Sequence, residues 1–353
     1  MTFISIFKIQ FNVIYYTTRL VNSAFYNFAP ELKATVKMSE GKWSVILNPN
    51  AGGKLAGREW PHIEKELLSQ GFVFDSVKTE KPMHAIQLVE KKLKEGYRKI
   101  IAIGGDGTLH EVVNGIMKQN HVNPDEILLA MISVGTGNDW IKTHLISPDY
   151  KIAIQQIKNG NTIRQDVGKI VYKNGGPNNE VRYFINSVGI GFDARVVEYI
   201  LPNKAKGLSN KSDYMLGLIK SLFTNKNILT RLQLDGKTIN AKIYNLTVGL
   251  CKFKGGGFKM SPHAIPNDGK LDITLACRIT KGKLIANLPK IFGGKVDQIK
   301  QFEFFKVTDL MLHPSGPMCT EADGEFLGHH PIQVSVIPSK LRLISDFKPE
   351  ILN

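Results

Sequence analysis

The chain has 353 residues, of which 42% are hydrophobic and 22% charged, and its 46 Lys and Arg against 31 Asp and Glu give a net charge of +15. Length and composition are ordinary for a globular protein of two domains, and the positive charge favours an anionic partner such as a nucleotide or an acidic membrane surface. No regular interleaving of basic and aromatic residues indicates nucleic-acid binding. The three cysteines are scattered, odd in number and without metal-ligand spacing, which favours a reducing cytoplasm.

The first 40 residues differ from the rest and are predicted to be an N-terminal extension. Residues 1–28 mix Phe, Ile, Tyr and Val with interrupting Lys8 and Arg19, so no run is long enough to span a bilayer. No signal-peptide pattern is evident. Two interpretations stay open: the segment is an interfacial membrane anchor, or translation starts at Met38, where M-S-E-G-K-W-S-V-I-L would begin a first strand.

From Trp43 the sequence alternates strand and helix patterns. Apolar runs predict a strand from Trp43, a strand over 72–78, and strands that end at Gly104 and Ser133, with helices over 61–70, 83–95, 108–118 and around 150–158. This alternation is typical of a parallel sheet with right-handed crossovers. We therefore expect an α/β domain over residues 41–160.

Three predicted strand ends carry polar, glycine-rich loops: N-P-N-A-G-G-K at 48–54, G-G-D-G-T at 104–108 and G-T-G-N-D at 135–139. Since strand carboxyl ends share one edge of an open parallel sheet, these loops should form a single crevice, where free N–H groups suit a phosphate. Asp106 would hold Mg²⁺ or receive a proton from an attacking hydroxyl; the alternative is a tight turn with a capping aspartate. Thr108 and Glu111 are predicted to form a capping box.

After residue 160, β-branched and aromatic segments joined by turns predict a mainly antiparallel second domain over 161–337. An exposed sheet edge in this domain would permit a homodimer. The last two strands are expected to return to the first domain, which would then include about 338–353. The expected strands are 162–172, 181–188, 231–234, 241–249, 271–276, 332–337 and 341–344, with helices within 194–200 and 212–223.

Together with D-G-E at 323–325, the three loops resemble the diacylglycerol kinase catalytic-domain family, the soluble lipid kinases that include bacterial diacylglycerol kinases and sphingosine kinases. The four blocks follow in the family's order, and the resemblance covers nearly everything after about Gly41. It implies ATP and Mg²⁺ as cofactors and a membrane lipid as substrate. The nucleotide-binding positions that it implies are Asn48, Gly52, Gly53, Lys54, Thr79, Gly104, Gly105, Asp106, Gly107, Thr108, Gly135, Thr136, Asn138 and Glu325.

The resemblance also assigns the catalytic carboxylates. It makes Asp323 the general base and Glu325 a support for nucleotide or metal, with Asp106 as the rival base. Gly324 permits a turn that brings Asp323 and Glu325 together, and the alternative for D-G-E is a plain hairpin turn. Asp106 and Asp139 are expected to organise Mg²⁺ and its waters.

Further positions follow from the same resemblance. Asp268 and the backbone oxygens of Lys270 and Leu271 match a magnesium loop, for which a plain turn capped by Asp268 is the alternative. Asp193 matches a position near the lipid headgroup in sphingosine kinases. Thr79 matches a threonine that contacts nucleotide, with a helix N-cap as the alternative.

The sequence thus predicts an ATP-dependent lipid kinase, cytoplasmic and peripherally associated with anionic membrane, acting on diacylglycerol first and on a sphingoid base second. One alternative is a small-molecule kinase of the NAD-kinase or phosphofructokinase type, which shares the glycine–aspartate turn. The separate N-P-N-A-G-G and G-T-G-N-D blocks argue against it. The other alternative is a non-catalytic lipid- or nucleotide-binding module, which would be expected to lack one of the acidic positions.

Overall fold

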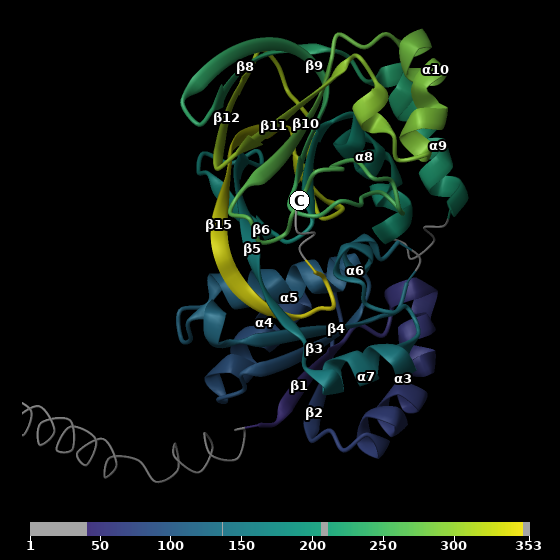
Figure 1. Ribbon diagram of the computed structural model, residues 1–353, viewed down its shortest axis with the longest axis vertical. Helices are drawn as coiled ribbons and strands as arrows, with labels where there is room; N and C mark the ends of the chain where they lie inside the picture. The colour runs from purple at the N-terminus through teal and green to yellow at the C-terminus, as the bar shows by residue number, and fades with distance from the viewer. Residues whose placement is uncertain (1–40, 136, 206–210, 349–353) are drawn as a thin grey trace, which may run out of the picture.

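The computed structural model describes residues 41–135, 137–205 and 211–348, which form two stacked domains (Figure 1). An α/β domain lies at the bottom of Figure 1 and a mainly antiparallel β domain lies above it. The predicted N-terminal extension over residues 1–40 and Thr136 of the third loop lie outside the described residues. The predicted fold class is confirmed.

The α/β domain is a parallel sheet with helices on both faces. Its elements are β1 (Trp43–Leu47), α3 (Ala51–Ser69), β2 (Phe74–Lys78), α4 (His84–Lys94), β3 (Lys99–Gly104), α5 (Asp106–Lys118), η1 (Pro124–Glu126), β4 (Leu128–Ser133), α6 (Asp139–His144) and α7 (Tyr150–Asn159). The strands lie in the order β2-β1-β3-β4. Ile100 and Ala102 of β3 share a buried core with α4 and α5, whereas Ile101 and Ile103 share one with α3 and α7. The apolar run predicted as a buried strand is therefore covered on both faces.

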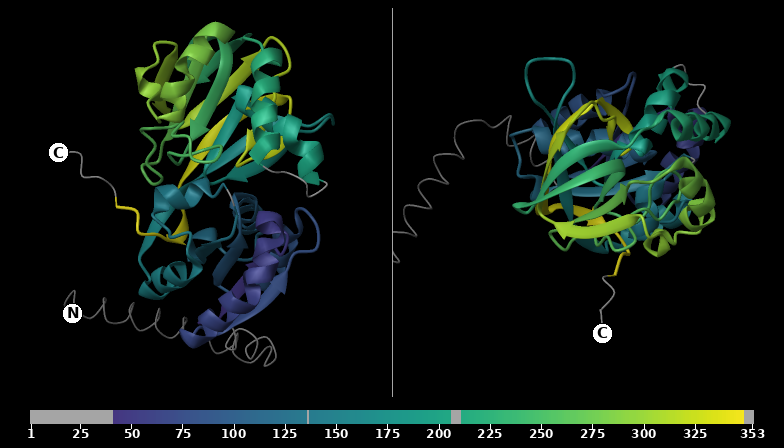
Figure 2. Two further views of the ribbon diagram at one scale, coloured as in Figure 1. Left: turned by 90° about the vertical axis from the view of Figure 1, so that its right-hand side faces the viewer. Right: turned by 90° about the horizontal axis from the view of Figure 1, so that it is seen from above.

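The β domain carries helices outside a curved antiparallel sheet (Figure 2). Its elements are β5 (Thr162–Lys173), β6 (Glu180–Phe184), β7 (Ser187–Gly191), α8 (Phe192–Ala205), α9 (Lys211–Thr224), β8 (Ile228–Leu234), β9 (Lys237–Gly249), β10 (Leu271–Cys277), α10 (Lys281–Phe292), η2 (Val296–Gln298), β11 (Phe302–Val307), β12 (Asp309–Pro314), β13 (Thr320–Ala322), β14 (Glu325–Gly328) and β15 (His330–Ile344). Tyr172, Phe184 and Leu246 are among the large side chains of its buried core.

Two long strands, β5 and β15, connect the domains. They pair antiparallel along most of their length, and Arg342 and Leu343 at the end of β15 pair parallel with β4 (Figure 1). The two strands predicted over 332–337 and 341–344 are one strand with an irregularity between Ile337 and Leu341. The described strands consequently form one continuous sheet across both domains.

The predicted strand over 181–188 is wrong in one respect, because it is two strands. β6 ends at Phe184 and β7 begins at Ser187, and each pairs with a different neighbour. The N–H groups of Ile185, Asn186 and Ser187 at the break bind the carboxylate of Asp323 instead of a strand. A side chain more than 130 residues away therefore interrupts the strand.

The predicted capping box is also wrong. α5 begins at Asp106, two residues before Thr108, and the Thr108 hydroxyl accepts a hydrogen bond from Asn48 Nδ2 at 3.0 Å. The Glu111 carboxylate accepts N–H bonds from Met83 and Ala85, at 2.9 and 3.1 Å. Glu111 therefore caps the start of α4 rather than that of its own helix.

Among the described residues, no helix is both long and apolar enough to cross a membrane.

Candidate functional site

The three glycine-rich loops meet at the carboxyl edge of the parallel sheet. Gly52 and Gly135 lie so close that a Cβ on Gly52 would be 3.3 Å from Gly135 Cα. Gly52, Gly53 and Lys54 have left-handed backbone angles, which glycine adopts at no steric cost. Lys54 is exposed at the rim of this edge, and Thr79 is buried beside the end of β1, where its N–H donates to Leu47 O. The predicted single crevice edge is thus formed by loops from β1, β3 and β4.

The G-G-D-G turn leaves no room for a side chain at Gly104. A Cβ on Gly104 would collide with the Thr108 hydroxyl, and a Cβ on Gly105 would lie 3.6 Å from Asn138 Oδ1. Asn138 Nδ2 donates to Gly135 O at 2.9 Å, but its Oδ1 is buried without a hydrogen-bond partner among the described residues. An unsatisfied buried acceptor is costly. This oxygen is therefore suited to a donor group of a ligand.

Asp106 lies at the centre of this edge. Its Oδ2 accepts an N–H bond from Asp139 at 2.8 Å and its Oδ1 a longer one from Trp140 at 3.4 Å. Burial raises the pKa of Asp106 to about 6, the two N–H bonds oppose the rise, and the carboxylates of Asp139 and Asp323 add to it. A carboxylate with such a pKa can accept and release a proton near neutral pH.

Asp139 links the two domains through its carboxylate. Its Oδ1 pairs with Lys142 Nζ at 2.8 Å, and its Oδ2 accepts the N–H of Gly256 at 2.7 Å. Gly256 belongs to the glycine-rich segment after β9, so this bond joins the α/β domain to the β domain. Each carboxylate oxygen of Asp139 thus has one contact, and the magnesium role expected of Asp139 stays a prediction.

Asp323 is enclosed by N–H donors. Its side chain is 1% exposed; Oδ1 accepts from the amides of Asn186 and Ser187, and Oδ2 from the amide of Ile185, all at 3.0 Å. His110 Nδ1 lies 3.0 Å from the same Oδ2. A carboxylate has about four acceptor positions. Because these four contacts fill them, the geometry favours Asp106 over Asp323 as the proton acceptor.

His110 and Asn114 are two buried residues of α5 that the sequence did not single out. Asn114 Nδ2 donates to the carbonyls of His110 and Tyr183, and it lies 3.3 Å from His110 Nε2. We assign the proton of a neutral imidazole to Nδ1, since Nδ1 faces a carboxylate and Nε2 faces an amide N–H₂. The spacing of the two residues, four apart on the helix after G-G-D-G, was the available signal.

Glu325 follows Asp323 and Gly324 in the turn between β13 and β14. Asp323 and Gly324 have φ of +49° and +82°. Glu325 Oε1 would lie 3.1 Å from a Cβ on Gly107, in the first turn of α5. The D-G-E hairpin thus places one carboxylate against the G-G-D-G turn and the other behind it.

Asp193 belongs to a partly buried charge cluster on the β-domain side. Its carboxylate accepts from the Thr247 hydroxyl at 3.0 Å and lies 3.2 Å from Lys254 Nζ, which also pairs with Glu321. Burial disfavours the charged ammonium, but Glu321 and Asp193 outweigh that effect and raise the pKa of Lys254. Lys254 and Glu321 were not predicted as site residues. Two lysines before G-G-G at 255–257 were the only local signal.

The predicted magnesium loop between β9 and β10 gathers oxygen ligands. Asp268 Oδ1 accepts from Lys270 N at 3.0 Å, and Oδ2 pairs with Lys306 at 2.8 Å. Asp272 Oδ2 is buried without a hydrogen-bond partner in the described part of the chain. Burial raises the pKa of Asp272 to about 6, Lys306 opposes the rise, and Asp268 adds to it. Asp272 Oδ2 lies 3.6 Å from Lys306 Nζ, so Lys306 would compete with a hard cation for this all-oxygen set.

Comparisons with known proteins cover most of the chain. A family model described as "Diacylglycerol kinase catalytic domain" matches residues 42–170, and one described as "YegS C-terminal NAD kinase beta sandwich-like domain" matches 186–345. YtlR of Bacillus subtilis is 30% identical over 315 residues, 85% of this chain and 98% of that protein. A diacylglycerol kinase of Staphylococcus aureus is 30% identical over 294 residues, 80% and 88% of the two chains. The crystal structure of a diacylglycerol kinase from Bacillus anthracis shares the fold, with a TM-score of 0.69 at 22% identity over 87% of this chain and 97% of that one.

Proposed function

The chain belongs to the diacylglycerol kinase catalytic-domain family and is a lipid kinase, and on this premise we propose that it transfers the γ-phosphoryl group of ATP to a hydroxyl of diacylglycerol. A sphingoid base is the second candidate acceptor. The observation that carries the proposal is the meeting of three glycine-rich loops around Asp106, with the D-G-E hairpin closing on the first turn of α5. Phosphoryl transfer depends on positioning and charge stabilisation, and this edge supplies both.

The proposed reaction assigns each group a step. The backbone of Gly52, Gly53 and the G-G-D-G turn would receive the phosphates, with Lys54 at the rim as a positive charge. Mg²⁺, when bound, would neutralise phosphate charge, and Glu325, whose carboxylate lies against Gly107, would hold it. Asp106 would take the proton of the attacking lipid hydroxyl. The oxygen then bonds to phosphorus as the bond to the leaving ADP breaks.

Asp323 would act as a positioning residue in this scheme. Its bonds to residues 185–187 and to His110 tie the hairpin to β7 on one side and to α5 on the other. Loss of these bonds would move Glu325 relative to Gly107. We assign the lipid headgroup to the side of the molecule that carries the charge cluster of Asp193, Lys254 and Glu321.

We also propose a peripheral association with the cytoplasmic membrane surface. α9 exposes Leu216, Ile219 and Phe223 on one face, with 51%, 48% and 60% exposed, and Lys220 lies between them. Apolar side chains interspersed with lysine suit an anionic bilayer surface.

A homodimer is a further proposal, because β11 pairs only with β10 among the described strands and so leaves a sheet edge open. Sedimentation velocity at rising protein concentration would test it.

The test of the function is ATP consumption by the purified protein. The acceptors are detergent-dispersed diacylglycerol, a sphingoid base, NAD and fructose 6-phosphate. We expect turnover with diacylglycerol and none with the water-soluble acceptors. Turnover only with NAD or the sugar phosphate would refute the lipid assignment. Lipid analysis of cells with and without the protein would identify the phosphorylated product.

A further inference from the structure

A second cluster of possible ligands lies in the β domain, away from the three glycine-rich loops. Glu198 of α8, Cys319 just before β13 and His329 just after β14 each offer one ligand atom, and these atoms all lie within 4.8 Å of one another. His329 Nε2 is 2.9 Å from Glu198 Oε1, and the Cys319 thiol donates to Glu198 Oε2 at 3.5 Å. Among the described residues, it is the only group of three or more His, Cys, Asp or Glu side chains that meets this condition.

Backbone hydrogen bonds and a ring contact hold the segments that carry Cys319 and His329. The Met318 N–H donates to His329 O at 2.8 Å, which joins the two ends of the β13–β14 hairpin. The Gly191 N–H donates to Cys319 O at 2.8 Å, which attaches the hairpin to β7. The Phe326 ring packs edge-on against the His329 ring, with centroids 5.4 Å apart. The ligand atoms therefore converge from a rigid hairpin and a helix that follows directly from β7.

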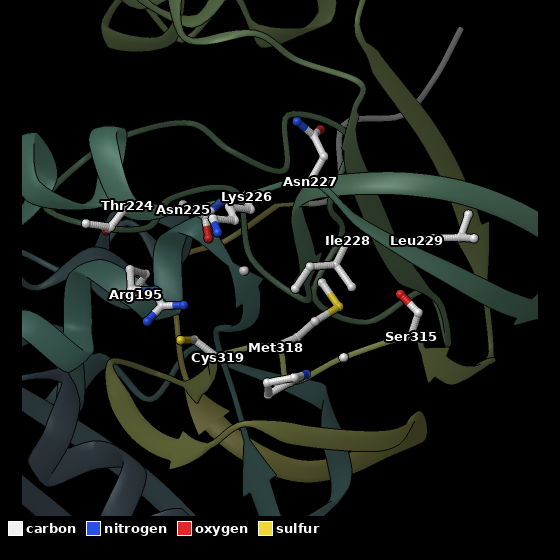
Figure 3. Close-up of a pocket in the computed structure, with 13 residues that line it drawn as sticks. Arg195, Thr224, Asn225, Lys226, Asn227, Ile228, Leu229, Ser315, Met318 and Cys319 are labelled. Carbon is white, nitrogen blue, oxygen red and sulfur yellow. The ribbon is translucent and has the colours of Figure 1, made fainter.

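Arg195 competes with a metal ion for the Glu198 carboxylate, but its position also lets it orient that carboxylate for the metal. Its NH1 pairs with Glu198 Oε2 at 3.1 Å, whereas Oε1 is the oxygen that faces His329. Oε2 thus receives both the guanidinium and the Cys319 thiol, and a metal on Oε1 would leave Arg195 as the partner that orients the carboxylate. Cys319 and Arg195 also line a cavity of 510 Å³, and Figure 3 shows the sulfur and the guanidinium on the same side of it.

We propose that Glu198, Cys319 and His329 bind one Zn²⁺ ion per chain. Sulfur, imidazole nitrogen and a carboxylate oxygen form the donor set of a borderline-soft metal, and Mg²⁺, which requires oxygen ligands, is a poor fit. Three protein ligands leave a fourth tetrahedral position for a water molecule or a group that enters from the cavity. The scattered cysteines gave no spacing signal, because the ligands come from segments 121 and 10 residues apart.

The metal would connect two elements that carry site residues. Asp193 lies at the start of α8, five residues before Glu198, and Asp323 and Glu325 lie at the tip of the hairpin whose base holds Cys319 and His329. A metal that joins α8 to the base of the β13–β14 hairpin would fix the position of Asp193 relative to Asp323 and Glu325.

Metal binding by the whole, tag-free protein tests this without any kinase assay. Metal-free protein is titrated with Zn²⁺ against a chromophoric chelator, and Co²⁺ is used as a spectroscopic substitute. We expect one equivalent to bind, a thiolate-to-Co²⁺ charge-transfer band, and no displacement by excess Mg²⁺. Cys319→Ser and His329→Gln should each weaken Zn²⁺ binding by at least about 10-fold, the lower end of what loss of even a supporting partner costs, and Cys319→Ser should remove the band.

The chain offers matched controls. His330→Gln changes the exposed neighbouring histidine, and Cys277→Ser changes a buried cysteine on β10; both should bind Zn²⁺ as the wild type does. If Cys319→Ser does not fold, His329→Gln decides alone, since the His329 side chain is 39% exposed. Absence of stoichiometric binding, equal binding by wild type and His329→Gln, or displacement by Mg²⁺ would overturn the proposal.

Discussion

Asp106 and Asp323 can be distinguished by the pH dependence of turnover. An acceptor of the hydroxyl proton must be ionised, so kcat/KM should rise with pH and level off above about 6, the pKa to which burial raises Asp106. Asp106→Asn should remove this acidic limb and lower kcat by about 10²–10⁴-fold. The measurement is a series of rates in lipid–detergent micelles between about pH 5 and pH 8. An acidic limb that persists in Asp106→Asn would show that another group takes the proton.

Asp323→Asn should show the complementary pattern. The amide keeps one acceptor oxygen but turns an N–H₂ group toward two of the four donors, and an unsatisfied buried donor costs about 1–3 kcal/mol. We expect the free energy of unfolding to fall by about 2 kcal/mol or more, with the acidic limb near pH 6 retained in the remaining activity. Asp125→Asn, in η1 before the opposite end of β4, is the control. If Asp323→Asn keeps the wild-type free energy of unfolding but loses the acidic limb of the pH profile, Asp323 is the base.

His144 makes α6 sensitive to acid. Its ring is fully buried, stacks on Trp140 at 4.1 Å and lies 2.9 Å from Ser345 Oγ in the segment after β15. Burial lowers its pKa to about 3. Below about pH 6.5, His144 therefore binds a proton in the unfolded chain but not in the folded chain. The free energy of unfolding falls as pH falls from 6.5 toward 3.

Between pH 7 and pH 5 this one group should cost about 2 kcal/mol of unfolding free energy. Urea unfolding at the two pH values measures it, as the difference between wild type and His144→Gln. His313→Gln, an exposed histidine on β12, should lose as much stability as the wild type. The same loss in His144→Gln would show that the buried imidazole is not responsible.

The loop between β9 and β10 should respond to Mg²⁺ if it binds the cation. A ligand that binds only the folded chain raises the thermal midpoint by mass action. Mg²⁺ should therefore raise the Tm of the nucleotide-free wild type, and the rise should be reduced in Asp268→Asn and in Asp272→Asn. Asp235→Asn, an aspartate in the β8–β9 turn, serves as the control. Equal rises in all four proteins would place the bound Mg²⁺ elsewhere.

At the scale of the whole molecule, the charge of +15 predicts salt-sensitive binding to anionic vesicles. Vesicle sedimentation should show binding that weakens as ionic strength rises, and little binding to neutral vesicles. Phe223→Ser should weaken binding at every salt concentration, because the exposed ring contributes apolar area. Thr224→Ser, at the next exposed position, is the control. Equal binding to neutral and anionic vesicles at low salt would refute the electrostatic contribution.

The sequence by itself determined the layout of the chain, because the relevant signals are local. Strand and helix periods and the glycine-rich turns lie within about ten residues, and they predicted the parallel sheet, the change to antiparallel strands and the three loops at one edge. The roles of Asp106 and Asp323 required contacts that no local pattern encodes. The donors around Asp323 come from residues 185–187, up to the first residue of β7, and from His110 of α5, which are 136 to 138 and 213 positions away. No local pattern encodes the contact of Glu111 of α5 with the start of α4, or the position of Lys254 beside Asp193 and Glu321. Only the tertiary structure decided which carboxylates are enclosed by donors and which keep capacity for a proton, since hydrogen-bond saturation depends on what the fold places around each oxygen.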